Sequence, residues 1–104
     1  MKPAQTESSL TNVLDLFSLK GKVAIVTGGG GIAGRQISTA LSQAGATTYV
    51  TTRKQDRLSD LEQEFEEAGC NIKAVYMDQT DEASVLALRD QLVQNEGKMD
   101  ILVN

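Results

Sequence analysis

Apolar, β-branched runs alternate along this chain with segments in which apolar residues recur every three or four positions. The runs predict strands, and they lie at Val23–Val26, Thr47–Thr51, Ile72–Met77 and Ile101–Val103, of which the first reads as fully buried. The segments between them predict helices, at Gly34–Ala44, at Gln55–Ala68 and from Asp81 to Gly97. Strands that alternate with helices of this length predict parallel strands joined by right-handed crossovers.

Each expected helix has one apolar face and a glycine stop. The expected buried positions are Ile37, Leu41 and Ala44 in the first, Leu58, Leu61, Phe65 and Ala68 in the second, and Val85, Leu88 and Leu92 in the third, widened by Leu86 and Val93. Gly45, Gly69 and Gly97 follow the helices as stop signals, and Asp81 is suited to cap the third.

The order β-α-β-α-β-α-β predicts an α/β protein, the first part of a doubly wound parallel sheet with strand order 3-2-1-4. The fourth strand would then be an unpaired edge, and the third helix would lie on a face without its usual neighbours. Because a buried-type strand at an edge is a liability, we expect a piece of a longer chain, truncated after the fourth strand. We assign residues 21–104 to this domain.

Residues 1–20 form a lead-in to the domain. Leu10, Val13, Leu14 and Phe17 have helical spacing, which allows a short helix. We favour instead a partly ordered segment that packs Phe17 and Leu19 against the domain.

Composition excludes several classes of function. The 104 residues suffice for one small domain, and a net charge of −4 without a basic cluster argues against nucleic-acid binding. We expect no membrane association, because no apolar run approaches the ~20 residues of a membrane span, and the N-terminus lacks the apolar core of a secretory signal. Cys70 is the only cysteine and there is no histidine, so we expect no metal site, and a reducing cytoplasm fits best.

The segment Val23–Arg35, VAIVTGGGGIAGR, carries the strongest chemical signal. A buried strand, a glycine turn and a helix N-terminus in that order build a corner that binds phosphate through backbone N–H groups. A flexible glycine linker would rarely be flanked at once by such a strand and helix. The sequence favours this corner over a P-loop, because Arg35, and not Lys-Ser/Thr, follows Gly34.

KGKVAIVTGGGGIAGRQI, followed by AGA at 44–46, DQTD at 78–81 and DILVN at 100–104, resembles the N-terminal part of a short-chain dehydrogenase/reductase. The resemblance covers residues from about 17 to 104 and implies a Rossmann-type fold. Ile32 stands at the middle glycine position of the compact branch, whereas Thr27, Gly28, Gly31 and Gly34 satisfy a spacing usual in the extended branch. The lead-in and the ending favour the compact branch.

The resemblance places the cofactor on Gly28, Gly30, Gly31, Ile32, Ala33 and Gly34. In such folds an acidic residue at the end of the second strand binds the ribose 2′-OH of NAD, and an arginine attracts the 2′-phosphate of NADP. Thr52 stands about where the acidic residue would be, and Arg53 follows. This favours NADP, with NAD possible; the alternative is that Arg53 is a solvated charge near Asp56.

Further cofactor contacts are implied by the resemblance at Asp78, Gln79 and Asn104. Asp78 would bond the adenine amino group while Gln79 borders the ring, although Asp78 also suits the turn into the third helix. Asn104 matches the first residue of the family's Asn-Asn-Ala-Gly motif and would border the ribose.

No catalytic residue is expected in these residues. The family's chemistry uses a Ser and a Tyr-x-x-x-Lys pair, but Arg53 and Thr80 follow Tyr49 and Tyr76 at that spacing. The resemblance therefore implies the cofactor-binding half of an oxidoreductase that, when intact, acts on a small carbonyl or alcohol, such as a sugar or polyol, and forms a homo-oligomer. Alone it should bind cofactor weakly and be inactive. The alternatives are a non-catalytic nucleotide-sensing module and an extended-type sugar-nucleotide epimerase or dehydratase.

Overall fold

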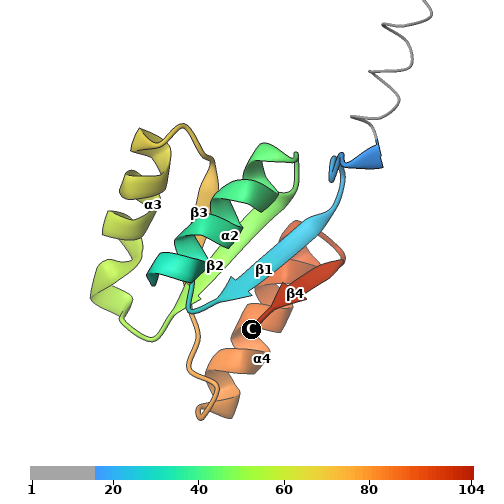
Figure 1. The fold of residues 1–104 in the computed structure, drawn as a ribbon. Helices are drawn as coiled ribbons and strands as arrows, with labels where there is room; N and C mark the ends of the chain where they lie inside the picture. Colours follow the sequence, from blue (N-terminus) through green and yellow to red (C-terminus); the bar gives the residue numbers. More distant parts are fainter. Residues whose placement is uncertain (1–15) are drawn as a thin grey trace, which may run out of the picture.

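The structure, a computed structural model, describes residues 16–104 as one parallel sheet with helices on both faces (Figure 1). Its elements in chain order are β1 (Val23–Thr27), α2 (Ile32–Gln43), β2 (Thr47–Thr52), the short 3-10 helix η1 (Gln55–Arg57), α3 (Leu58–Glu67), β3 (Ile72–Tyr76), α4 (Glu82–Asn95) and β4 (Ile101–Val103). The strand order is β3-β2-β1-β4, and all pairs are parallel. The predicted fold class and strand order are confirmed.

Two apolar clusters lie on opposite faces of the sheet, because successive side chains of a strand point to opposite sides. On the face covered by α4, the cluster comprises Val23, Ile25, Tyr49, Val75, Met77, Leu88 and Leu92. On the face covered by α2 and α3, it comprises Val26, Val50, Leu61, Phe65, Cys70, Ile72 and Ala74. The central strands β1 and β2 contribute to both clusters and so hold the two layers of helices together.

The helix ends follow the sequence signals more closely than the helix starts. Gly45, Gly69 and Gly97 adopt positive φ angles of 105°, 81° and 76° after the three helices, as a glycine stop requires. The Asp81 side chain accepts a hydrogen bond from the Ala83 N–H at 3.2 Å and caps α4. By contrast, α2 begins at Ile32, two residues before the predicted start, without a side-chain cap.

Several expected buried positions are wrong, and Ala68, which follows α3, is one of them because it is exposed. Ile37 on α2 is 38% exposed, and the face turned to the sheet carries the buried Ser38 instead. On α4 only Leu88 and Leu92 of the expected apolar face are buried, whereas Val85, Leu86 and Val93 are exposed. Only part of the apolar surface of α4 is thus covered by the sheet, and the exposed Val85 and Val93 line an apolar groove together with Leu102 of β4.

The lead-in does not pack as expected. Phe17 is 72% exposed, so the prediction that it packs against the domain is wrong, while Leu19 is half-buried and its N–H donates to the Ala44 carbonyl at 2.7 Å. A backbone bond to the end of α2 therefore anchors this segment in place of an aromatic contact. The possible helix at Leu10, Val13 and Leu14 lies outside the described residues.

Candidate functional site

The turn between β1 and α2 is closed by three glycines. Gly28 has a φ of +66°, which disfavours any residue with a side chain. A Cβ atom on Gly34 would lie 2.6 Å from the Gly28 carbonyl oxygen, and one on Gly29 would overlap the Cβ of Val50 on β2. The turn is therefore compact because the chain packs against itself, and an anion can approach the backbone closely.

The N-terminus of α2 is open. Its N-cap residue, Gly31, offers no side chain, and its first turn contains no acidic residue. The N–H groups of Ile32, Ala33 and Gly34 donate no hydrogen bond within residues 16–104. Unpaired N–H groups and the positive end of the helix dipole favour an anion at this point.

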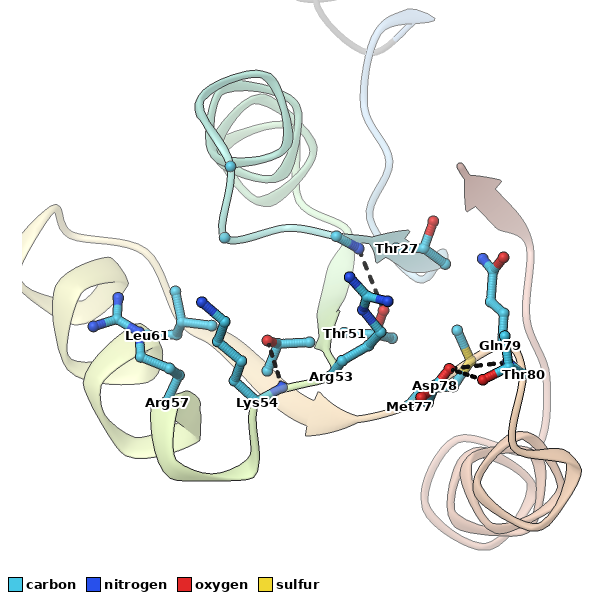
Figure 2. A pocket seen from close by; sticks show the side chains of 14 residues that line it. Thr27, Thr51, Arg53, Lys54, Arg57, Leu61, Met77, Asp78, Gln79 and Thr80 are labelled. Carbon is cyan, nitrogen blue, oxygen red and sulfur yellow. Dashed lines mark hydrogen bonds between the residues drawn. The ribbon is translucent and has the colours of Figure 1, made fainter.

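A cleft of about 830 Å³ lies beside this turn, along the carboxyl ends of β1, β2 and β3 (Figure 2). It is lined by Thr27, Gly28, Gly30, Gly31, Thr51, Thr52, Arg53, Lys54, Arg57, Leu61, Met77, Asp78, Gln79 and Thr80. The Gly28 N–H donates to the Thr51 hydroxyl at 3.4 Å, which joins the glycine turn to β2. Ligands of doubly wound sheets bind outside the carboxyl ends of the strands, so this cleft is the candidate site.

Basic side chains gather where β2 ends. Arg53, Lys54 and Arg57 all line the cleft (Figure 2). The chain carries no carboxylate where β2 ends, at Thr51, Thr52 and Arg53. Arg57 is 3.7 Å from Glu64 and 3.8 Å from Asp60, whereas Arg53 and Lys54 form no ion pair with the described residues. Two cations are thus available to a ligand anion.

Asp78, at the opposite wall, is held by the turn that follows β3. Its Oδ1 accepts hydrogen bonds from the Thr80 hydroxyl at 2.7 Å and the Thr80 N–H at 2.9 Å. These bonds lower the pKa of Asp78, and the nearby Arg53 charge contributes in the same direction. The carboxylate is therefore ionised at neutral pH and can accept a hydrogen bond from a ligand.

The buried Ser84 fixes the backbone of the same turn. Its hydroxyl accepts from the Asp78 N–H at 2.9 Å and lies 2.9 Å and 2.8 Å from the carbonyl oxygens of Asp78 and Asp81. Sequence reasoning missed this residue, because a serine in the first turn of a helix is an ordinary helix-start residue.

The structure brings together most of the residues expected to bind cofactor. Gly28, Gly30, Gly31, Arg53, Asp78 and Gln79 line the cleft. Ile32, Ala33 and Gly34 lie next to it, at the start of α2, where Ile32 is 83% exposed. Asn104 borders a neighbouring groove, and the Thr27 hydroxyl donates to its Oδ1 at 3.3 Å.

Three contributors besides Ser84 were not expected. Gly29 is required by its contact with Val50, which the sequence spacing alone does not show. Lys54 and Arg57 line the cleft with Arg53, and the signal for them was three basic residues within the segment RKQDR directly after a strand.

The family model described as short chain dehydrogenase matches residues 22–104. The chain belongs to the short-chain dehydrogenase/reductase family. The match covers every strand and helix described above and all the residues of the cleft.

Relatives of known name support this assignment. Sorbose reductase of Candida albicans is 36% identical over 101 residues, covering 97% of this chain and 36% of that protein. The crystal structure of 2-keto-3-deoxy-D-gluconate dehydrogenase from Streptococcus agalactiae is similar with a TM-score of 0.78 and 36% identity, covering 85% of this chain and 33% of that one. A gluconate 5-dehydrogenase from Burkholderia cenocepacia, in complex with NADP and tartrate, has a TM-score of 0.74 and 30% identity over 86% of this chain and 35% of that one.

The chain spans about a third of the length of these relatives. Within residues 16–104, no helix is long and apolar enough to cross a membrane, and acidic and cysteine side chains form no group suited to a metal ion.

Proposed function

We propose that this chain is the cofactor-binding half of an NADP-dependent oxidoreductase. The intact protein would transfer hydride between the nicotinamide and a small carbonyl or alcohol, such as a sugar or polyol. The observation that carries the proposal is the placement of Arg53 and Lys54 across the cleft from the glycine turn, with no carboxylate at the end of β2. The sugar and sugar-acid names of the relatives support the substrate class.

The residues present fit a dinucleotide. The glycine turn and the open N–H groups at the start of α2 would hold the pyrophosphate, and Asp78 would accept a bond from the adenine amino group. Arg53 and Lys54 would neutralise a 2′-phosphate, which a carboxylate at the end of β2 would repel. When bound, the nicotinamide would supply the hydride.

Residues 16–104 contain no Tyr-x-x-x-Lys pair that could donate a proton to a substrate oxygen. Both tyrosines lie in the strands β2 and β3, and Tyr49 is completely buried. We therefore expect no NADPH oxidation by the 104-residue chain with any sugar or ketone, and detectable turnover would contradict this. In a longer chain that contains these residues, the same pair would distinguish an enzyme from a non-catalytic sensor.

Cofactor preference is tested by titrating the 104-residue chain with NADP and with NAD while its amide NMR signals are recorded. We expect tighter binding of NADP, with shifts at the glycine turn and at the end of β2. Arg53→Ala removes a charged contact to the 2′-phosphate, worth about 1.5–3 kcal/mol, and should weaken NADP binding by at least about tenfold. It should leave NAD binding nearly unchanged.

The matched control is Arg89→Ala, which removes an exposed arginine that pairs with Asp90 on α4. It should alter the affinity for neither cofactor. Equal affinity of the unmodified chain for NAD and NADP, or an unchanged NADP affinity in Arg53→Ala, would refute the proposed preference.

A further inference from the structure

The side chain of Arg35 joins the glycine turn to α3. Its Nε donates a hydrogen bond to the Gly30 carbonyl oxygen at 2.9 Å, and its guanidinium lies 2.6 Å from Oε2 of Glu64. The backbone N–H of the same residue donates to the Gly31 carbonyl at 2.9 Å. Two successive carbonyl groups of the turn are therefore held by one residue.

This arrangement fixes the direction of the peptide groups that an anion would meet. In a trans peptide the C=O and the following N–H point in opposite directions. Because the Gly31 carbonyl is bound by Arg35, the Ile32 N–H of the same peptide group points away from that bond and remains without a partner in residues 16–104. The Gly30 carbonyl shares its peptide group with the Gly31 N–H, which donates to the Gly28 carbonyl at 3.3 Å. The Arg35 side chain holds the other side of that peptide group, so that the Gly30 oxygen does not turn toward the ligand, where it would repel a phosphate.

Glycine makes such control necessary. The run Gly28–Gly31 has no side chains, and glycine reaches both signs of φ easily, so its backbone is restricted by packing and by long hydrogen bonds such as the Gly31 N–H to the Gly28 carbonyl at 3.3 Å. Without the bond to Gly30, the turn would lose more conformational freedom on binding, and affinity would fall.

Within residues 16–104, the charge of Arg35 is paired with Glu64, unlike the charges of Arg53 and Lys54 in the cleft. A cation in the first turn of a helix opposes the helix dipole, and Glu64 offsets that cost by pairing with it. Arg35 does not line the cleft, whereas Arg53 and Lys54 do. Its effect on a ligand must therefore pass through the turn that it holds.

We propose that Arg35, held by Glu64, is a positioning residue that orients the glycine turn for the pyrophosphate shared by NAD and NADP. This inference rests on the proposed function, since it assigns to the turn the binding of a nucleotide diphosphate. Glu64 acts on the turn through Arg35, because its ion pair keeps the guanidinium directed at the Gly30 carbonyl.

The test uses two probes, one for binding at the glycine turn and one for binding at the basic residues after β2. ADP carries the diphosphate without a 2′-phosphate, and 2′-AMP carries only the 2′-phosphate. In NMR titrations of the 104-residue chain, Arg35→Gln should weaken ADP binding about tenfold and leave 2′-AMP binding within about twofold. Arg53→Ala should do the reverse, and Arg89→Gln should change neither.

Glu64→Gln provides a second variant that leaves Arg35 in place. It should weaken ADP binding in the same direction, and the double variant should be no weaker than Arg35→Gln, because both changes break one chain of contacts. If Arg35→Gln does not fold, Glu64→Gln with the two probes decides the matter when it is compared in an Arg57→Gln background, because Glu64 also lies 3.7 Å from Arg57 of the cleft. Thermal unfolding of each variant identifies a loss of fold.

Unchanged ADP affinity in Arg35→Gln, equal losses for ADP and 2′-AMP, or additive effects of the two substitutions would overturn the positioning role. Failure of the proposed function would look different: the unmodified chain would bind neither probe. Binding of both probes by the unmodified chain, with ADP alone sensitive to Arg35, supports both proposals.

Discussion

The carboxylate of Asp100 accepts a hydrogen bond from the backbone N–H of Val23 at 2.8 Å, although the two residues are 77 positions apart. The backbone is tied in the other direction as well, since the Asp100 N–H donates to the Val23 carbonyl at 2.9 Å. These bonds join the start of β4 to the start of β1. They set the register in which Ala24, Ile25 and Val26 pair with Ile101, Leu102 and Val103.

This contact predicts an acid-sensitive contribution to stability. The Val23 N–H and, to a lesser extent, Lys98 lower the pKa of Asp100 below its usual value of 3.8. A lowered pKa in the folded state stabilises the fold above about pH 4, and this contribution is lost as the pH falls through the folded-state value. Asp100→Asn should therefore lower the urea midpoint at pH 7 and have little effect at pH 2.

The control for that measurement is Asp90→Asn, because Asp90 is exposed and, among residues 16–104, pairs only with its neighbour Arg89. It should leave the midpoint almost unchanged at both pH values. A midpoint difference for Asp100→Asn that is independent of pH would contradict the assigned role of its charge.

A second prediction concerns Tyr49, which is completely buried in β2 and donates its hydroxyl to Oε2 of Glu96 at 2.7 Å. Burial, followed by the bond to Glu96, raises the pKa of this tyrosine above 10.0. Tyr49→Phe should reduce the free energy of unfolding by about 1 kcal/mol near neutral pH, measured in guanidinium chloride.

Because the pKa of Tyr49 is raised, the stabilisation from its contact with Glu96 depends on pH in the alkaline range. The stabilisation is complete below the pKa of an unfolded tyrosine and is lost as the pH rises through the folded-state value. In an ultraviolet titration, the tyrosine ionisation whose midpoint lies above 10.0 should disappear in Tyr49→Phe. Its persistence in Tyr49→Phe would show that the assignment to Tyr49 is wrong.

The glycine turn allows two alanine substitutions to be compared, each of which adds a single methyl group. A Cβ on Gly34 would lie 2.6 Å from the Gly28 oxygen, whereas the nearest atom to one on Gly31 would be 3.8 Å away. Gly34→Ala should cost about 1–3 kcal/mol through overpacking, and Gly31→Ala should cost much less. Chemical denaturation measures both, and equal losses would contradict the packing described for the turn.

The buried Ser84 leads to a fourth prediction. Ser84→Ala leaves the Asp78 N–H without its acceptor and should destabilise the fold by about 1–3 kcal/mol. It should also broaden the amide signals of the turn at 78–81. Ser59→Ala, at an exposed position of α3, is the control that should change neither observable.

The sequence predicted the sheet because its strands are short and rich in β-branched residues, with an apolar run in β1 and mostly threonine and valine in β2. The strand order was predicted from the usual order of doubly wound sheets. The helix stops were predicted at Gly45, Gly69 and Gly97, and all three glycines have positive φ angles. The start of α2 was less predictable because Gly31 caps it without a side chain. Nothing local in the sequence marked Ile32 as its first residue.

Burial on the helices was harder to predict than their presence. Val85 and Leu88 have equally suitable spacing on α4, but Leu88 is buried and Val85 is exposed, because the available sheet covers only part of that helix. The contact of Arg35 with Gly30 and Glu64 depends on how α2 and α3 lie side by side. Periodicity describes one helix at a time and carries no such information.

The contacts that hold the layers together and the side chains that line the cleft lie at opposite ends of the sheet. At the end where the strands begin, backbone bonds such as Leu19 to Ala44, Thr47 to Lys22 and Asp100 to Val23 hold the layers together. At the other end lie the exposed Arg53, Lys54 and Gln79 of the cleft, which contribute little to the core. Ligand preference can therefore be redesigned, or drift during evolution, by exchanging those side chains without a matching loss of thermal stability.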